Sequence, residues 1–110
     1  MKYTFGVSYD SCGIKLSNYV EFELELTEKE VETIISFLKE NGDCDYGYLE
    51  PIDSSLFWKI NDAGNDAVLK SINEDRGEEE QLDFFDVDWT SMFFEFSWPD
   101  SLLDAAGLNN

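Results

Sequence analysis

The sequence predicts an α+β domain, in which a mainly antiparallel four-stranded sheet, with elements in the order β-β-α-α-β-β, is covered on one face by two helices. Two segments alternate apolar and polar residues, and two segments between them repeat apolar residues at helical spacing. The chain has 110 residues, of which 43% are hydrophobic, and this is enough for one core despite a net charge of -18. We therefore expect residues 1–110 to form a single compact domain.

The first 26 residues have the pattern of a long β-hairpin. Apolar residues at alternate positions place one face toward a core: Tyr3, Phe5, Val7 and Tyr9. A turn is expected at 10–13. In the second strand, which ends at Leu26, the apolar residues keep even numbers while Glu21, Glu23 and Glu25 take the odd ones. This strand should therefore have one buried and one acidic face.

A helix is expected directly after this strand. Thr27 is a good N-cap, and Glu30 three residues later completes a capping box. Gly42 is placed to end the helix, because glycine readily adopts the left-handed conformation after a last turn.

A turn-rich loop and a second helix follow. Residues 42–51 are rich in Gly, Asp and Tyr and end in Pro51, which is typical of a loop. Residues 54–73 repeat apolar side chains at helical spacing, although the pair Gly64-Asn65 could interrupt the helix.

The last third predicts a second hairpin and a short terminal helix. Residues 85–98 alternate aromatic side chains with carboxylates, and Thr90-Ser91 would form the turn. Leu82, Phe84 and Phe93 break this alternation, which implies a bulge or exposed aromatic surface. The outer sheet face would then be acidic, and its carboxylates would come from both hairpins: Glu21, Glu23, Glu25, Asp86, Asp88 and Glu95.

Several function classes lack the residues they require. The chain contains no His and no glycine-rich phosphate-binding or nucleophile-elbow motif, so we expect neither an enzyme nor a cofactor site. Cys12 and Cys44 alone cannot complete a four-ligand zinc site. The Asp-x-Asp pairs at 43–45 and 86–88 fall in no EF-hand loop. No specific metal site is therefore expected.

The charge also limits the partners. Seven basic residues against 25 acidic ones should repel nucleic acid, which binds proteins through phosphate contacts with Lys and Arg. No apolar stretch is long enough to span a membrane, and the first residues do not have the pattern of a signal peptide, so a cytoplasmic location is expected. Two blocks are the most acidic: residues 20–52 hold ten acids and two bases, and residues 77–110 hold nine acids and no base.

These observations predict a small cytosolic inhibitor that binds a basic protein, such as a nuclease. An immunity protein that neutralises a toxin and an anti-defence protein that mimics nucleic acid both fit. Alternate residues of a strand repeat every 6.6 to 6.8 Å or so, which is about two phosphate steps along B-DNA. Acids and interface-type aromatic residues make up the expected partner-binding set: Glu21, Glu23, Glu25, Asp43, Asp45, Tyr46, Tyr48, Asp86, Asp88 and Glu95.

Two other hypotheses stay open. The acidity could serve only solubility, in a domain with some scaffolding role. The carboxylates could also bind a divalent metal ion or another small ligand. The oligomeric state is not predicted.

Overall fold

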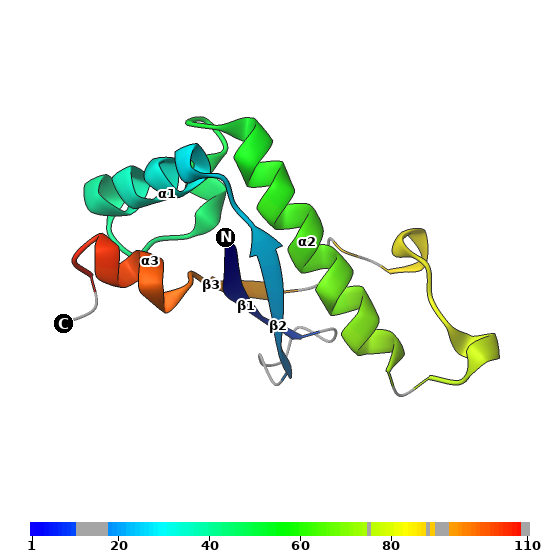
Figure 1. Ribbon diagram of the computed structural model, residues 1–110. Coiled ribbons are helices and arrows are strands. Elements are labelled where there is room, and N and C mark those ends of the chain that lie inside the picture. The colour runs from blue at the N-terminus through cyan, green and yellow to red at the C-terminus, as the bar shows by residue number, and fades with distance from the viewer. Residues whose placement is uncertain (11–17, 75, 88, 90–92, 109–110) are drawn as a thin grey trace.

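The computed structural model describes residues 1–10, 18–74, 76–87, 89 and 93–108. Three strands, β1 (Lys2–Asp10), β2 (Asn18–Glu25) and β3 (Phe93–Ser97), form an antiparallel sheet in the order β2-β1-β3. Three helices pack with it: α1 (Glu28–Asn41), α2 (Ser54–Asn73) and α3 (Asp100–Ala105) (Figure 1). The α+β class is confirmed. The described part of the chain has three strands, however, in place of the four expected, and the short terminal helix that the sequence predicts forms as α3.

The first hairpin forms as its alternation predicts. β1 pairs with β2 in a register that places Val7 opposite Val20 and Phe5 opposite Phe22. Phe5, Val7 and Tyr9 are buried, so the predicted apolar face of β1 is the one that meets the core. Of the expected turn, Asp10 ends β1, and positions 11–13 lie outside the described residues.

The predicted ends of α1 are confirmed. The Glu30 backbone amide donates to Thr27 Oγ1 at 3.2 Å, and the Thr27 amide donates to Glu30 Oε1 at 2.9 Å, which completes the capping box. Gly42 ends the helix with a φ of 77°. An N-cap such as Thr27 contributes about 1 kcal/mol to the stability of the protein.

α2 runs without interruption through Gly64. At this position the helix lies very close to the sheet, because a Cβ atom added to Gly64 would be 2.7 Å from Cε1 of Phe96 and 3.5 Å from Cζ of Phe22. Gly64 therefore permits a close helix–sheet approach, and the possible break at Gly64-Asn65 is absent. A hydrogen bond of 2.7 Å between Tyr9 Oη and Ser71 Oγ joins the same helix to β1.

The predicted turn of the second hairpin, at 90–91, lies outside the described residues, and the described part of its first strand does not form. Residues Phe84–Asp86 form a 3-10 turn, and β3 pairs with β1, with Phe96 opposite Val7. The carboxylate of Asp86 accepts from the Asp83 amide at 2.9 Å, so short-range bonds from aspartate side chains replace a strand ladder. Phe85, expected in the core, is 94% exposed.

Residues 76–87, which we call the arm, extend away from the sheet and the helices (yellow in Figure 1). Asn73 at the end of α2 holds the base of the arm, because its side chain accepts from the Leu82 amide and donates to the Leu82 carbonyl oxygen, each at 2.9 Å. The molecule is correspondingly elongated, with extents of 45 × 27 × 24 Å.

Candidate functional site

Acidic residues from three separate segments line one hollow beside β3. We call it the acidic hollow and define it by Asp43, Asp45, Glu95 and Asp100. Its volume is about 440 Å³. The apolar part of its lining comes from four side chains: Phe94, Phe96, Trp98 and Leu103. Among the described residues that line it there is no Lys or Arg, so its charge is uniformly negative.

Trp98 holds the loop of the hollow against the sheet. Its indole Nε1 donates to the Cys44 carbonyl oxygen at 3.0 Å, between the two aspartates of the loop. The ring is only 5% exposed and packs against Phe5 and Phe37, with centroid distances of 6.2 and 5.9 Å. Asp45 also accepts from the Gly47 amide at 2.9 Å, which fixes the end of the loop. The loop that carries Asp43 and Asp45 is therefore tied to the core through Trp98.

The Cys44 thiol in the hollow is not suited to nucleophilic chemistry. Burial raises the pKa of Cys44, and the negative charges of Asp45 and Asp43 raise it further. Only the thiolate is a strong nucleophile or metal ligand, so a thiol with a raised pKa stays protonated and unreactive near neutral pH. Cys44 is therefore not a candidate for a covalent nucleophile.

Glu21, Glu23 and Glu25 are exposed on β2, and two of them are ion-paired. Lys2 Nζ lies 3.8 Å from Glu23, and the N-terminal ammonium contacts Glu25. The hydrogen bond from this ammonium lowers the pKa of Glu25. Within the described part of the chain Glu21 has no ion pair. Glu21 is therefore the carboxylate of this row that is most available to a partner.

A second hollow connects the strand row to the acidic hollow. It has a volume of about 630 Å³, lies over Gly6 and Tyr19, and shares Ser97, Trp98 and Asp100 with the acidic hollow. Tyr19, Glu21 and Asp100 line this hollow together, and the pKa of Tyr19 is raised by burial first and then by the charges of Glu21 and Asp100. The predicted residues Glu21, Asp43, Asp45 and Glu95 thus lie along one continuous surface.

Tyr46 and Tyr48 do not project together, which corrects the expectation drawn from their shared parity. Residues Tyr46–Leu49 form a 3-10 turn in place of an extended loop, so residues two apart do not share a face. Tyr46 lies on the core, stacked on Phe57 with centroids 5.3 Å apart, and its hydroxyl donates to Asn61 Oδ1 at 2.5 Å. Tyr48 is 68% exposed and stays available as a contact residue.

Replacing Tyr46 by Phe should lower the free energy of unfolding by about 1 kcal/mol near neutral pH, because the hydrogen bond to Asn61 is lost. Burial raises the pKa of Tyr46 above its ordinary value of 10.0. A raised pKa in the folded state stabilises the wild type below pH 10, and this contribution disappears as the unfolded tyrosine ionises at higher pH. Urea unfolding of the wild type and of Tyr46→Phe between about pH 8 and 11 should therefore show that the difference between their free energies of unfolding becomes smaller as the pH rises. A constant difference would contradict this interpretation.

Of the two remaining predicted carboxylates, only Asp86 lies in the described part of the chain, and it is not on the sheet. Asp86 belongs to the arm, where it binds the Asp83 amide, and its predicted place on the outer sheet face is wrong. Asp88 lies outside the described residues. The arm also carries an exposed aromatic pair, Phe84 and Phe85, whose rings meet edge to face at 5.6 Å. The broken parity at Leu82 and Phe84 was the signal in the sequence for this surface.

Asp100 is a member of the hollow that the sequence did not indicate. It follows the Pro99 that ends the last strand, a position typical of an ordinary helix start. Its relation to Asp43 and Asp45 depends on how β3 and α3 pack, which no local pattern records.

The carboxylates of the described residues do not gather into a metal centre. In the parts of the chain that the structure describes, no group of three or more Cys, Asp or Glu is arranged to hold a metal ion. No helix among the described residues is long and apolar enough to cross a membrane. No protein-family model, curated protein or solved structure matches the chain, so its function has to be inferred from the charges and contacts of the site itself.

Proposed function

We propose that this protein is a cytoplasmic inhibitor that binds a basic protein and covers the surface with which that protein contacts its substrate. The observation that carries the proposal is the acidic hollow, whose lining includes four acidic residues and several aromatic residues but no described basic residue. A basic partner complements this hollow in charge, while nucleic acid would be repelled by it.

The hollow suits a Lys or Arg side chain from the partner. Carboxylates at its rim would hold the cationic group by charge-assisted hydrogen bonds, which are stronger than neutral ones. Phe94 and Phe96 lie in the same lining and are half-buried, so they offer aromatic surface to the aliphatic part of the side chain or to the cation. The net charge of -18 would attract the partner from a distance and speed association at low salt.

A nuclease or another nucleic-acid-handling protein is the partner that this charge pattern fits best. Such proteins present Lys and Arg clusters to phosphate groups, and the carboxylates of Glu21 and Glu23 repeat along β2 at about the spacing of two phosphate steps. Together with Glu95 and Asp100 they would form an acidic outer surface that substitutes for nucleic acid. Toxin immunity and anti-defence inhibition both use this chemistry.

A fourfold amide variant tests the proposal: Asp43→Asn, Asp45→Asn, Glu95→Gln and Asp100→Asn. Each change removes one negative charge and keeps the shape of the side chain. In Asp45→Asn the amide oxygen can still accept the hydrogen bond from the Gly47 amide. The matched control removes four exposed charges elsewhere: Glu32→Gln, Glu40→Gln, Glu50→Gln and Asp104→Asn. Both variants have the same net charge, so any difference between them reports the position of the charge.

Wild type and variants would be immobilised and exposed to a lysate of the source cells at low and at high salt. We expect the wild type to retain a discrete basic protein, and we expect the hollow variant to bind it at least about tenfold more weakly than the control, because a close charge pair contributes about 1.5 kcal/mol or more. Equal weakening of both variants, or retention only of many basic proteins that high salt removes, would mean that the charge acts generically and would overturn the proposal.

A further inference from the structure

The free edge of β2 exposes backbone groups that have no partner strand in the described sheet. β2 is the outermost strand on its side, and its residues Asn18–Glu25 are paired only with β1. At the end of this ladder the Leu26 amide donates to the Met1 carbonyl oxygen at 3.1 Å. Because hydrogen-bonded residues alternate in an antiparallel ladder, the even-numbered residues of β2 bond to β1. The backbone groups of Glu21 and Glu23 therefore point away from the sheet.

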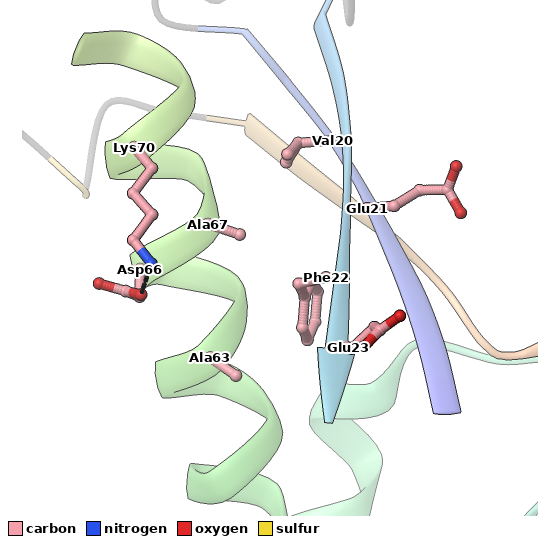
Figure 2. A pocket seen from close by; sticks show the side chains of 8 residues that line it. All are labelled: Val20, Glu21, Phe22, Glu23, Ala63, Asp66, Ala67 and Lys70. Carbon is pink, nitrogen blue, oxygen red and sulfur yellow. Dashed lines mark ion pairs between the residues drawn. The ribbon is translucent and has the colours of Figure 1, made fainter. Parts of the chain in front are cut away.

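A groove of about 340 Å³ runs along this edge, between β2 and α2. Figure 2 shows Val20 and Phe22 on the side of β2 that faces Ala63 and Ala67 of α2, whereas the carboxylates of Glu21 and Glu23 point away from the helix. Glu21 and Glu23 nevertheless line the groove, which agrees with their backbone groups facing it. The groove thus combines an apolar floor with main-chain donors and acceptors that no described strand pairs.

The charge of the edge determines which strand could pair with it. A second copy of this chain is excluded as the occupant, because pairing β2 with β2 would bring two rows of glutamates together, and like charges on adjacent strands are destabilising. A strand with Lys or Arg at alternate positions would place these residues beside Glu21 and Glu23. Its other side chains would enter the groove, where the Lys70 charge is already offset by Asp66, 3.3 Å away.

We infer that an extended basic segment of the partner adds to β2 as a further antiparallel or parallel strand, with apolar side chains in the groove and cationic side chains over Glu21 and Glu23. This inference rests on the proposed function and specifies how the partner is bound. Main-chain hydrogen bonds supply affinity in such strand addition, and the alternating side chains supply selectivity.

A pair of variants at one position separates the backbone contribution from the charge. Glu21→Gln and Glu21→Pro both remove the carboxylate charge, but only proline also removes the amide that faces the groove. The bonds to β1 come from the even-numbered neighbours, and edge strands tolerate proline, so the sheet should persist in both variants. Circular dichroism and urea unfolding would verify this.

The probe is a terminally blocked six-residue peptide that alternates Lys and Val, and its control has the same composition in two blocks, three Lys followed by three Val. Titration into labelled protein at low salt should give binding to the wild type that is about five- to tenfold weaker for Glu21→Pro than for Glu21→Gln, the loss expected for one hydrogen bond. The block peptide should bind more weakly than the alternating one. Equal affinities of the two variants, equal affinities of the two peptides, or no binding to the wild type would overturn the inference.

A measurement on the wild type keeps the test valid if Glu21→Pro fails to fold. Saturating alternating peptide should slow hydrogen exchange of the Glu21 and Glu23 amides and leave that of Phe22, which already bonds to β1, unchanged. Unchanged exchange at Glu21 and Glu23 would overturn strand addition. These results are independent of the fourfold amide variant, so capture of a basic protein through the acidic hollow could succeed while strand addition at β2 fails.

Discussion

Replacing Trp98 by Ala should lower the free energy of unfolding by about 3–5 kcal/mol, the cost of removing a large buried aromatic side chain. Trp98 lies where the end of β3, the helix α1 and the loop of the acidic hollow meet, and it is 5% exposed. The change leaves a cavity against Phe5 and Phe37 and removes the hydrogen bond that holds the Cys44 carbonyl. For a domain of this size the loss is a large part of the total stability.

Trp58→Ala is the matched control, because it makes the same substitution on a ring that is 50% exposed. Urea unfolding at neutral pH should show a loss for this control of less than half of that for Trp98→Ala. Trp98→Phe keeps much of the volume and should cost about 1 kcal/mol through the lost indole donor. Similar losses for Trp98→Ala and Trp58→Ala would show that Trp98 is not the packing centre that we describe.

The first hairpin and α1 could be predicted because their signals are local. Alternation through Phe5, Val7 and Tyr9 defines a strand face, and the reciprocal hydrogen bonds of Thr27 and Glu30 involve residues three apart. The prediction of the second hairpin was wrong because the pairing of its last strand is not local. The aromatic alternation of residues 93–97 was correct for β3, but its partner is β1, more than 80 residues earlier in the chain, and local pattern does not encode that pairing.

The arm shows why alternation alone misled. Phe85 alternates with carboxylates like a strand residue, yet Asp83 and Asp86 hydrogen-bond each other's backbone and close a 3-10 turn. Aspartate competes well for nearby amides, so an Asp-rich segment has an alternative to a strand that its apolar residues do not reveal. The parity breaks at Leu82 and Phe84 were the sequence signal for that alternative.

For the candidate site, residue type was easier to predict than position. Asp43, Asp45 and Glu95 were expected to bind a partner from their charge, and the structure places them on one hollow, although partner binding itself stays a prediction. Asp100 was missed because it joins the hollow only through the packing of α3. The prediction that Tyr46 projects toward a partner assumed an extended loop. The loop instead forms a 3-10 turn, and the Tyr46 ring packs against Phe57.

The close approach of α2 to the sheet also determines the shape of the groove beside β2, and Gly64 is the residue that permits it. Replacing Gly64 by Val should lower the free energy of unfolding by about 3 kcal/mol, because overpacking of a filled core costs about 1–3 kcal/mol and β-branching adds strain in a helix. The ring of Phe96 cannot move aside freely, since Tyr46 lies against it with a centroid distance of 3.9 Å.

Gly64→Ala separates two opposing effects at this position. Alanine favours a helix over glycine by about 1 kcal/mol, so a helix that faced solvent would become more stable. Here the new Cβ would lie 2.7 Å from Phe96 Cε1, and we expect the steric cost to exceed the gain, for a net loss of about 1 kcal/mol. Urea unfolding would measure both Gly64 variants.

A double-mutant cycle with Phe96→Leu tests whether the clash is the cause. Leucine removes the ring atoms that the new Cβ would meet, so Gly64→Ala should become neutral or stabilising in the Phe96→Leu background, with a coupling energy of about 1 kcal/mol or more. If the losses in stability from Gly64→Ala and Phe96→Leu were additive, the contact between Gly64 and Phe96 would not determine how closely α2 approaches the sheet. The width of the groove beside β2 would then depend on other residues of α2.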